Sequence, residues 1–161
     1  SGGSAGLDRV PERGLAARAF GGGKVMSFGG INYLAVFIAA VAAFAIRAVW
    51  YGALVSKWWI KASRLAPEKM KPTLQPFVVS FLGELVMAWV LAGVIGHLGP
   101  GQATLWNGIV SGFFVWAGFM ITTMAINHRY HGYGWDLTLI DGGHWLLVAL
   151  AMGAIIGAME V

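Results

Sequence analysis

Four long blocks of apolar residues dominate this sequence and limit what it can fold into. They cover residues 31–55, 77–98, 105–126 and 137–159 and are each 22 to 25 residues long. A helix needs about 20 apolar residues to cross a hydrocarbon layer of roughly 30 Å. Within lipid, an open chain can satisfy its backbone polar groups only as helices. The blocks therefore predict an all-α integral membrane protein with four transmembrane helices.

The composition supports this assignment and excludes several classes of function. Only 11% of the residues are charged and the mean hydropathy is +0.70, whereas a soluble domain carries about 25% charged residues. The chain has no cysteine, which excludes disulfides, thiolate metal sites and cysteine catalysis. Its net charge of +4 comes from basic residues beside the apolar blocks. Membrane topology explains that pattern better than nucleic-acid binding does.

Polar segments precede and join the apolar blocks. Residues 1–30 are rich in glycine and arginine and predict a flexible basic N-terminal arm. The first connection, residues 56–76, is basic and contains three prolines, the second is a tight Gly-Pro-Gly turn, and the third carries Arg129 between two histidines. Short connections make successive helices antiparallel neighbours. Residues 31–161 are therefore expected to form one up-down four-helix bundle.

The distribution of Lys and Arg predicts an orientation. The first and third connections hold six of them, the N-terminal arm holds four, and the second connection and the C-terminus hold none. The count is therefore six against four, or six against none if the native chain starts at Met26. Cytoplasmic loops of membrane proteins are enriched in Lys and Arg. We therefore expect these two connections in the cytoplasm and both termini outside it.

Arg47 and Glu84 lie within apolar blocks, where a charge costs several kcal/mol unless it faces protein or water. At about 1.5 Å of rise per residue, each lies roughly 10 Å from the cytoplasmic end of its helix. Opposite charges at the same depth on adjacent helices predict an intramembrane ion pair. The pair has two interpretations: a structural lock between helices, or part of a functional cavity.

A second polar group is expected at the same depth in the other half of the chain. It comprises Asp141 and His144 in the fourth helix, with Thr122, Thr123 and Asn127 at the end of the third. In the structural interpretation, Asp141 caps the first turn of the fourth helix and accepts a hydrogen bond from His144. In the functional one, Glu84, Asp141 and His144 line a cavity open to the cytoplasm that exchanges protons or holds a small solute.

The sequence offers little sign of a cofactor, a metal or catalysis. His144 or His97 could ligate a haem or pigment, but a lone helical histidine is a very weak signal, and we predict neither cofactor nor metal. The sequence contains no paired-histidine zinc motif, nucleophile elbow or phosphate loop. We therefore expect a protein that is not an enzyme.

Two pairs of glycines match the spacing at which membrane helices associate closely. They are Gly108 with Gly112 in the third block and Gly153 with Gly157 in the fourth. Small residues four positions apart let helix backbones approach one another. The motifs predict tight packing, either within the chain or between chains.

Several short motifs, in their order and spacing, resemble one known family. They include Ile31-Asn32-Tyr33-Leu34-Ala35-Val36, Trp50-Tyr51-Gly52-Ala53-Leu54, Lys61-Ala62-Ser63, Pro67-Glu68-Lys69-Met70-Lys71, Trp116-Ala117-Gly118-Phe119, Gly143-His144-Trp145 and Met152-Gly153-Ala154-Ile155-Ile156-Gly157. From Ile31 onward the chain is similar to the domain-of-unknown-function 1761 family of small bacterial membrane proteins. The resemblance implies a four-helix protein of the bacterial cytoplasmic (inner) membrane and supplies no activity or site residue. The chain departs from the family pattern at Arg47, Glu84, Asp141 and His144.

These features favour a non-enzymatic protein of the lipid bilayer. We expect an accessory or structural subunit that associates with other membrane proteins or with copies of itself. The alternative is a small oligomeric transporter or channel that uses the cytoplasm-facing polar residues.

Overall fold

The computed structural model describes residues 30–66 and 73–159, and every regular element in these ranges is helical. The elements are α2 (Tyr33–Val49), η2 (Trp50–Leu54), α3 (Ser56–Ser63), α4 (Leu74–Gly96), α5 (Leu105–Val115), η4 (Trp116–Met120), α6 (Ile121–Tyr130) and α7 (Trp135–Ala158), where η2 and η4 are single π-helical turns. Four segments are long and apolar enough to cross a membrane: Tyr33–Leu54, Leu74–Gly96, Leu105–Tyr130 and Trp135–Ala158. The chain is an all-α, multi-pass membrane protein, as its apolar blocks predict. The predicted N-terminal arm lies outside the described residues, apart from Gly30.

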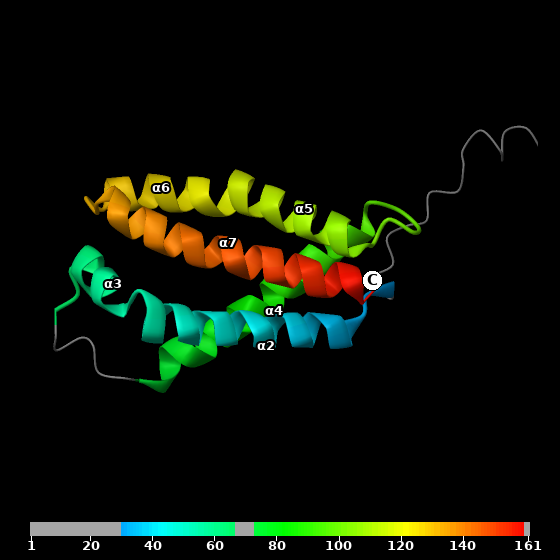
Figure 1. The fold of residues 1–161 in the computed structure, drawn as a ribbon, viewed down its shortest axis with the longest axis horizontal. Helices are drawn as coiled ribbons and strands as arrows, with labels where there is room; N and C mark the ends of the chain where they lie inside the picture. The colour runs from blue at the N-terminus through cyan, green and yellow to red at the C-terminus, as the bar shows by residue number, and fades with distance from the viewer. Residues whose placement is uncertain (1–29, 67–72, 160–161) are drawn as a thin grey trace, which may run out of the picture.

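Helix α7 is the central element of the bundle. It packs along α5 and α6 on one side and along α2 on another, and α4 crosses obliquely behind α2 and α7 (Figure 1). Helices α4 and α5, although joined by a short turn, touch each other less than either touches α7, and α5 packs mainly on α7. The end of α7 returns to the start of α2, where Asn32 Nδ2 donates to the Met159 carbonyl at 3.2 Å.

The first connection contains more helix than the sequence predicts. Eight residues after η2 form α3, which ends where Arg64 adopts a left-handed conformation with φ of 53°. Helix α4 begins at Leu74, before the expected start at residue 77, with Pro76 in its first turn. Proline is tolerated there because the first N–H groups of a helix have no intrahelical partner. The prolines at 67 and 72 lie outside the described residues.

Each of the two π-helical turns begins at a tryptophan whose indole N–H donates a hydrogen bond to the backbone of α7. Trp50 Nε1 donates to the Ile140 carbonyl at 3.1 Å, and Trp116 Nε1 donates to the Gly142 carbonyl at 2.8 Å. A π-turn adds one residue to a helix and changes the direction of the side chains that follow it. Two indoles thus approach α7 from opposite neighbours and hold the backbone on either side of Asp141.

The glycine motifs are used within the chain, where α5 meets α7. A Cβ atom at Gly108 would overlap the Gly153 carbonyl, and one at Gly153 would overlap the Gly108 carbonyl. Gly112 faces the Ala149 carbonyl and Gly157 faces the Thr104 carbonyl in the same way. Backbones this close leave no room for a side chain, so these four glycines fix the α5–α7 contact.

Replacing Gly153 with Ala is therefore expected to destabilise the protein by about 1–3 kcal/mol, because the added methyl group must push two backbones apart. Unfolding of the purified protein in detergent micelles measures the change. Gly93→Ala is the matched control: a Cβ there meets nothing within 4 Å, so the better helix propensity of alanine should leave stability unchanged or slightly raised. Equal losses in the two variants would contradict the assigned contact.

Candidate functional site

Arg47 and Glu84 form an ion pair between α2 and α4. Arg47 Nε lies 2.8 Å from Glu84 Oε1, with the Glu84 side chain fully buried and that of Arg47 25% exposed. The Arg47 guanidinium also lies over the Trp145 ring, 5.1 Å from its centroid. This one side chain therefore joins α2 to both α4 and α7. The matched depth read from the sequence identifies the two charged partners but not the tryptophan.

Asp141 is the centre of a second set of contacts. Its Oδ1 accepts hydrogen bonds from Tyr51 Oη at 2.8 Å and from Trp59 Nε1 at 3.1 Å. Its Oδ2 lies 3.8 Å from His128 Nε2. The interpretation of Asp141 as a first-turn cap is wrong, because α7 begins earlier, at Trp135, and has Asp136 in its first turn. Asp141 instead holds the first span, α3 and α6 against α7.

His144 is fully buried but makes none of the expected polar contacts. Its ring lies against those of Tyr51 and Trp145, with centroid distances of 4.9 Å in both cases. Both ring nitrogens, like Glu84 Oε2, have no hydrogen-bond partner among the described residues. The expected hydrogen bond to Asp141 is not formed, because that carboxylate is directed at Tyr51, Trp59 and His128.

The structure does not assemble the rest of the predicted polar group. Thr122, Thr123 and Asn127 are all exposed, and Thr122 Oγ1 donates to the Gly118 carbonyl of the preceding turn. The physical reason is the π-turn η4, whose extra residue rotates α6 by about 100° relative to an uninterrupted helix. His128, one position after Asn127, is the residue that reaches Asp141.

The end of the bundle beyond Asp141 is closed by side chains of α6. His128 Nδ1 lies 3.0 Å from Thr138 Oγ1, and Arg129 Nη2 donates to the same hydroxyl at 3.0 Å and to the Gly134 carbonyl at 2.6 Å. The Arg129 guanidinium stacks 4.1 Å from the centre of the Trp135 ring. These contacts tie the third connection down onto the start of α7.

Sequence reasoning missed Tyr51, Trp59 and His128 as members of the site. The aromatic residues at the end of the first block have the pattern of an interfacial belt, which fits the exposed Trp58 but not its neighbour Trp59. Nothing in the spacing distinguishes the two tryptophans. Only the docking of α3 against α7 turns one of them inward.

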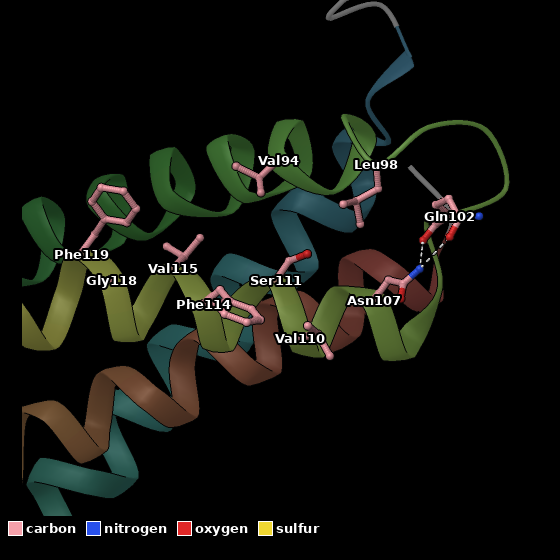
Figure 2. A pocket seen from close by; sticks show the side chains of 10 residues that line it. All are labelled: Val94, Leu98, Gln102, Asn107, Val110, Ser111, Phe114, Val115, Gly118 and Phe119. Carbon is pink, nitrogen blue, oxygen red and sulfur yellow. Dashed lines mark hydrogen bonds between the residues drawn. The ribbon is translucent and has the colours of Figure 1, made fainter.

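A separate groove lies between α4 and α5, at the other end of the bundle. It has a volume of about 830 Å³ and is lined by ten residues, among them Val94 and Leu98 from α4 and its end, and Val110, Phe114 and Phe119 from α5 and η4 (Figure 2). Gln102 and Asn107 close its polar end, where Asn107 Nδ2 donates to the Gln102 carbonyl at 2.8 Å. The size is within the range of about 300–1,000 Å³ typical of ligand sites.

The described residues contain no group of three His, Asp or Glu side chains placed to hold a metal ion. The polar groups that do converge are one guanidinium, two carboxylates, two imidazoles, a phenol and an indole N–H. Such groups can exchange hydrogen bonds and protons. They include neither a serine nor a cysteine to act as a nucleophile.

The fold and the buried network define a small four-helix membrane protein with its polar groups held inside the bundle. The family described as protein of unknown function, DUF1761, matches residues 34–157, and the chain belongs to this family. No curated protein and no solved structure matches the chain.

A double-mutant cycle tests the Arg47–Glu84 pair. Glu84→Leu leaves the Arg47 charge without its partner and should cost about 3–5 kcal/mol, whereas Arg47→Leu with Glu84→Leu should recover most of that loss. Unfolding in mixed micelles with increasing sodium dodecyl sulfate measures the stability of Glu84→Leu, of Arg47→Leu and of the double variant. If the two single losses simply add in the double variant, the ion pair is not the interaction that holds α2 to α4.

Proposed function

We propose that this protein is a non-enzymatic accessory or structural subunit that packs against other membrane helices. The open groove between α4 and α5 carries the proposal. Its walls are mainly apolar, and its opening faces the surroundings rather than another part of the described chain. A helix of a partner subunit, or of a second copy, would fill this space and complete the packing that α4 and α5 do not provide for each other.

One glycine of the groove, and a second glycine farther along α4, support association with a helix. A Cβ at Gly118, on the groove wall, would meet nothing within 4 Å, and the same holds for Gly83. Gly83 lies about three helical turns before Val94 and therefore on the same face of α4. Glycine within a helix costs up to about 1 kcal/mol relative to alanine. Close approach of a neighbouring helix gives such positions a role in membranes.

The arrangement of the charged groups also favours a structural role over an open pathway. Arg47 is paired with Glu84, and Asp141 is held by Tyr51 and Trp59. An open cavity would need these acids free to meet a solute. The alternative of a small oligomeric transporter or channel draws support from one observation, the fully buried His144 with both ring nitrogens unpartnered.

We further propose that the protein resides in the bacterial cytoplasmic membrane with both termini outside the cytoplasm. The support is the basic character of the first and third connections, which include Lys57, Lys61 and Arg129, and the absence of Lys and Arg from the second. This orientation puts the Asp141 network near the cytoplasmic face and the polar end of the groove near the outer face.

Association is tested by the size of the purified protein and the partners that remain bound in mild detergent. We expect an assembly clearly larger than the 17.1 kDa chain. Gly118→Leu and Gly83→Leu should lower the association constant about tenfold, and with it the assembled fraction, since a misfit worth about 1.4 kcal/mol changes the constant by that factor. Light scattering coupled to gel filtration measures the fraction.

The matched control for this test is Ala45→Leu. Ala45 is exposed on α2, away from the groove, so the added bulk should leave the assembly intact. A wild-type protein that purifies as a monomer without any partner would refute the accessory-subunit proposal. Dispersal by Ala45→Leu as well would show that the groove is not the contact surface.

The proposed orientation is testable because the chain has no native cysteine. Gln102→Cys, in the second connection, and His131→Cys, in the third, place single thiols at opposite ends of the bundle. A membrane-impermeant maleimide applied to intact cells should label Gln102→Cys, and should label His131→Cys only after the membrane is opened. The reverse pattern would overturn the orientation.

A further inference from the structure

Four buried side-chain polar atoms have no hydrogen-bond partner among the described residues. One is Arg129 Nε, and the other three, Glu84 Oε2, His144 Nδ1 and His144 Nε2, belong to two residues. Both residues have no exposed surface at all. A buried polar atom left without a hydrogen bond costs about 1–3 kcal/mol. Most buried polar atoms of native proteins are hydrogen-bonded to protein groups or to ordered water, so each exception calls for an explanation. Three of the four atoms belong to Glu84 and His144, and this concentration at two residues indicates an internal site.

The two residues occupy the same level of the bundle. Four-residue steps lead from His144 to Val148 and Met152, and from Glu84 to Ala88 and Ala92, and all four of these apolar residues belong to one buried cluster. Glu84 and His144 therefore lie one turn beyond that cluster on neighbouring helices. Arg47 links them, because its guanidinium bonds to Glu84 and lies over Trp145, the residue after His144.

The unpartnered atoms are chemically suited to hold water. An ionised Glu84 presents only acceptors, and a neutral His144 presents one donor and one acceptor nitrogen. A water molecule has two O–H donors, so one held between the two residues would serve both Glu84 Oε2 and the acceptor nitrogen of His144. Buried waters typically make about three hydrogen bonds to groups of this kind. The site would otherwise carry the cost of all three unsatisfied atoms.

A chain of titratable groups connects this level to the end of the bundle. The Tyr51 ring lies against His144, and its hydroxyl donates to Asp141. Asp141 in turn faces His128, which is partly exposed. The separation of 3.8 Å between Asp141 Oδ2 and His128 Nε2 is one at which a water molecule often mediates the contact.

The formal charges of the groups around the site differ by one from balance. The titratable or charged groups that face it among the described residues are Arg47 from α2, Tyr51 from η2, Glu84 from α4, His128 from α6 and Asp141 from α7. Arg129 lies farther out, bound to Gly134 and Thr138. With both carboxylates ionised and both histidines neutral, two negative charges face one guanidinium. One added proton balances these formal charges.

We propose that Glu84 and His144 form a hydrated proton-binding site inside the bundle, reached from its end through His128, Asp141 and Tyr51. On uptake, His144 becomes an imidazolium, and one of its N–H groups is stabilised by Glu84 Oε2 through the bridging water. The protein thus holds an exchangeable proton within the membrane, a property separate from association at the α4–α5 groove.

The experiment is infrared difference spectroscopy of the full chain in lipid nanodiscs, taken between mildly alkaline and mildly acidic pH. We expect a histidine ring signal from His144 and a water band that shifts when the sample is prepared in H₂¹⁸O. His144→Gln should remove both. The matched control is His97→Gln, at the exposed end of α4, which should leave the His144 signal and the water band in place.

A second variant guards against misfolding. Glu84→Gln alone leaves Arg47 without a counter-charge, so Arg47→Gln with Glu84→Gln is used, which should abolish the water band and keep the bundle folded. The proposal is overturned if wild-type spectra contain no ¹⁸O-sensitive band, if the band survives His144→Gln, or if that variant has the wild-type histidine signal. None of these outcomes depends on whether the protein associates with partners.

Discussion

The contact between Arg47 and Glu84 fixes how the bundle is assembled at its polar end. Lipid offers no water to either charge, so α2 and α4 must be placed with the two side chains together. The cation over Trp145 extends the same constraint to α7. The depth and the rotation of three helices are thereby set at one level. The apolar cluster of alanines with Val148, Met152 and Ile156 then packs in register beyond it.

The contacts that hold the helices together differ between the two ends of the bundle. Toward the end of α7, four glycines let α5 approach so closely that the backbones themselves are in contact. Near its start, indole N–H groups from the two π-turns and a hydrogen-bonded Asp141 replace that contact. Helix α4 takes part in neither arrangement along its face toward α5, and a groove remains there. The proposed association surface is thus a consequence of where the internal packing ends.

The buried network combines satisfied and unsatisfied groups, and this difference separates a structural from a functional interpretation. Asp141 has well-placed donors in Tyr51 and Trp59, as expected of a group that holds helices together. His144, three residues away on the same helix, has only ring contacts for its polar atoms. A histidine kept for packing alone could be replaced by an apolar residue of similar size at no cost in hydrogen bonds. Its presence at this level is what the proposed hydrated site explains.

The class of protein, the number of spans and the depth of the charged residues can all be predicted from the sequence. Hydrophobic length and the 1.5 Å rise of a helix are local properties, and they suffice to match Arg47 with Glu84. The rotation of each helix depended on tertiary structure. The π-turn η4 turned Asn127 outward and His128 toward Asp141, and the docking of α3 brought Trp59 inward while Trp58 stayed exposed. These orientations depend on which groups of the neighbouring helices lie opposite, here the Asp141 carboxylate, and no residue spacing along one chain segment contains that information.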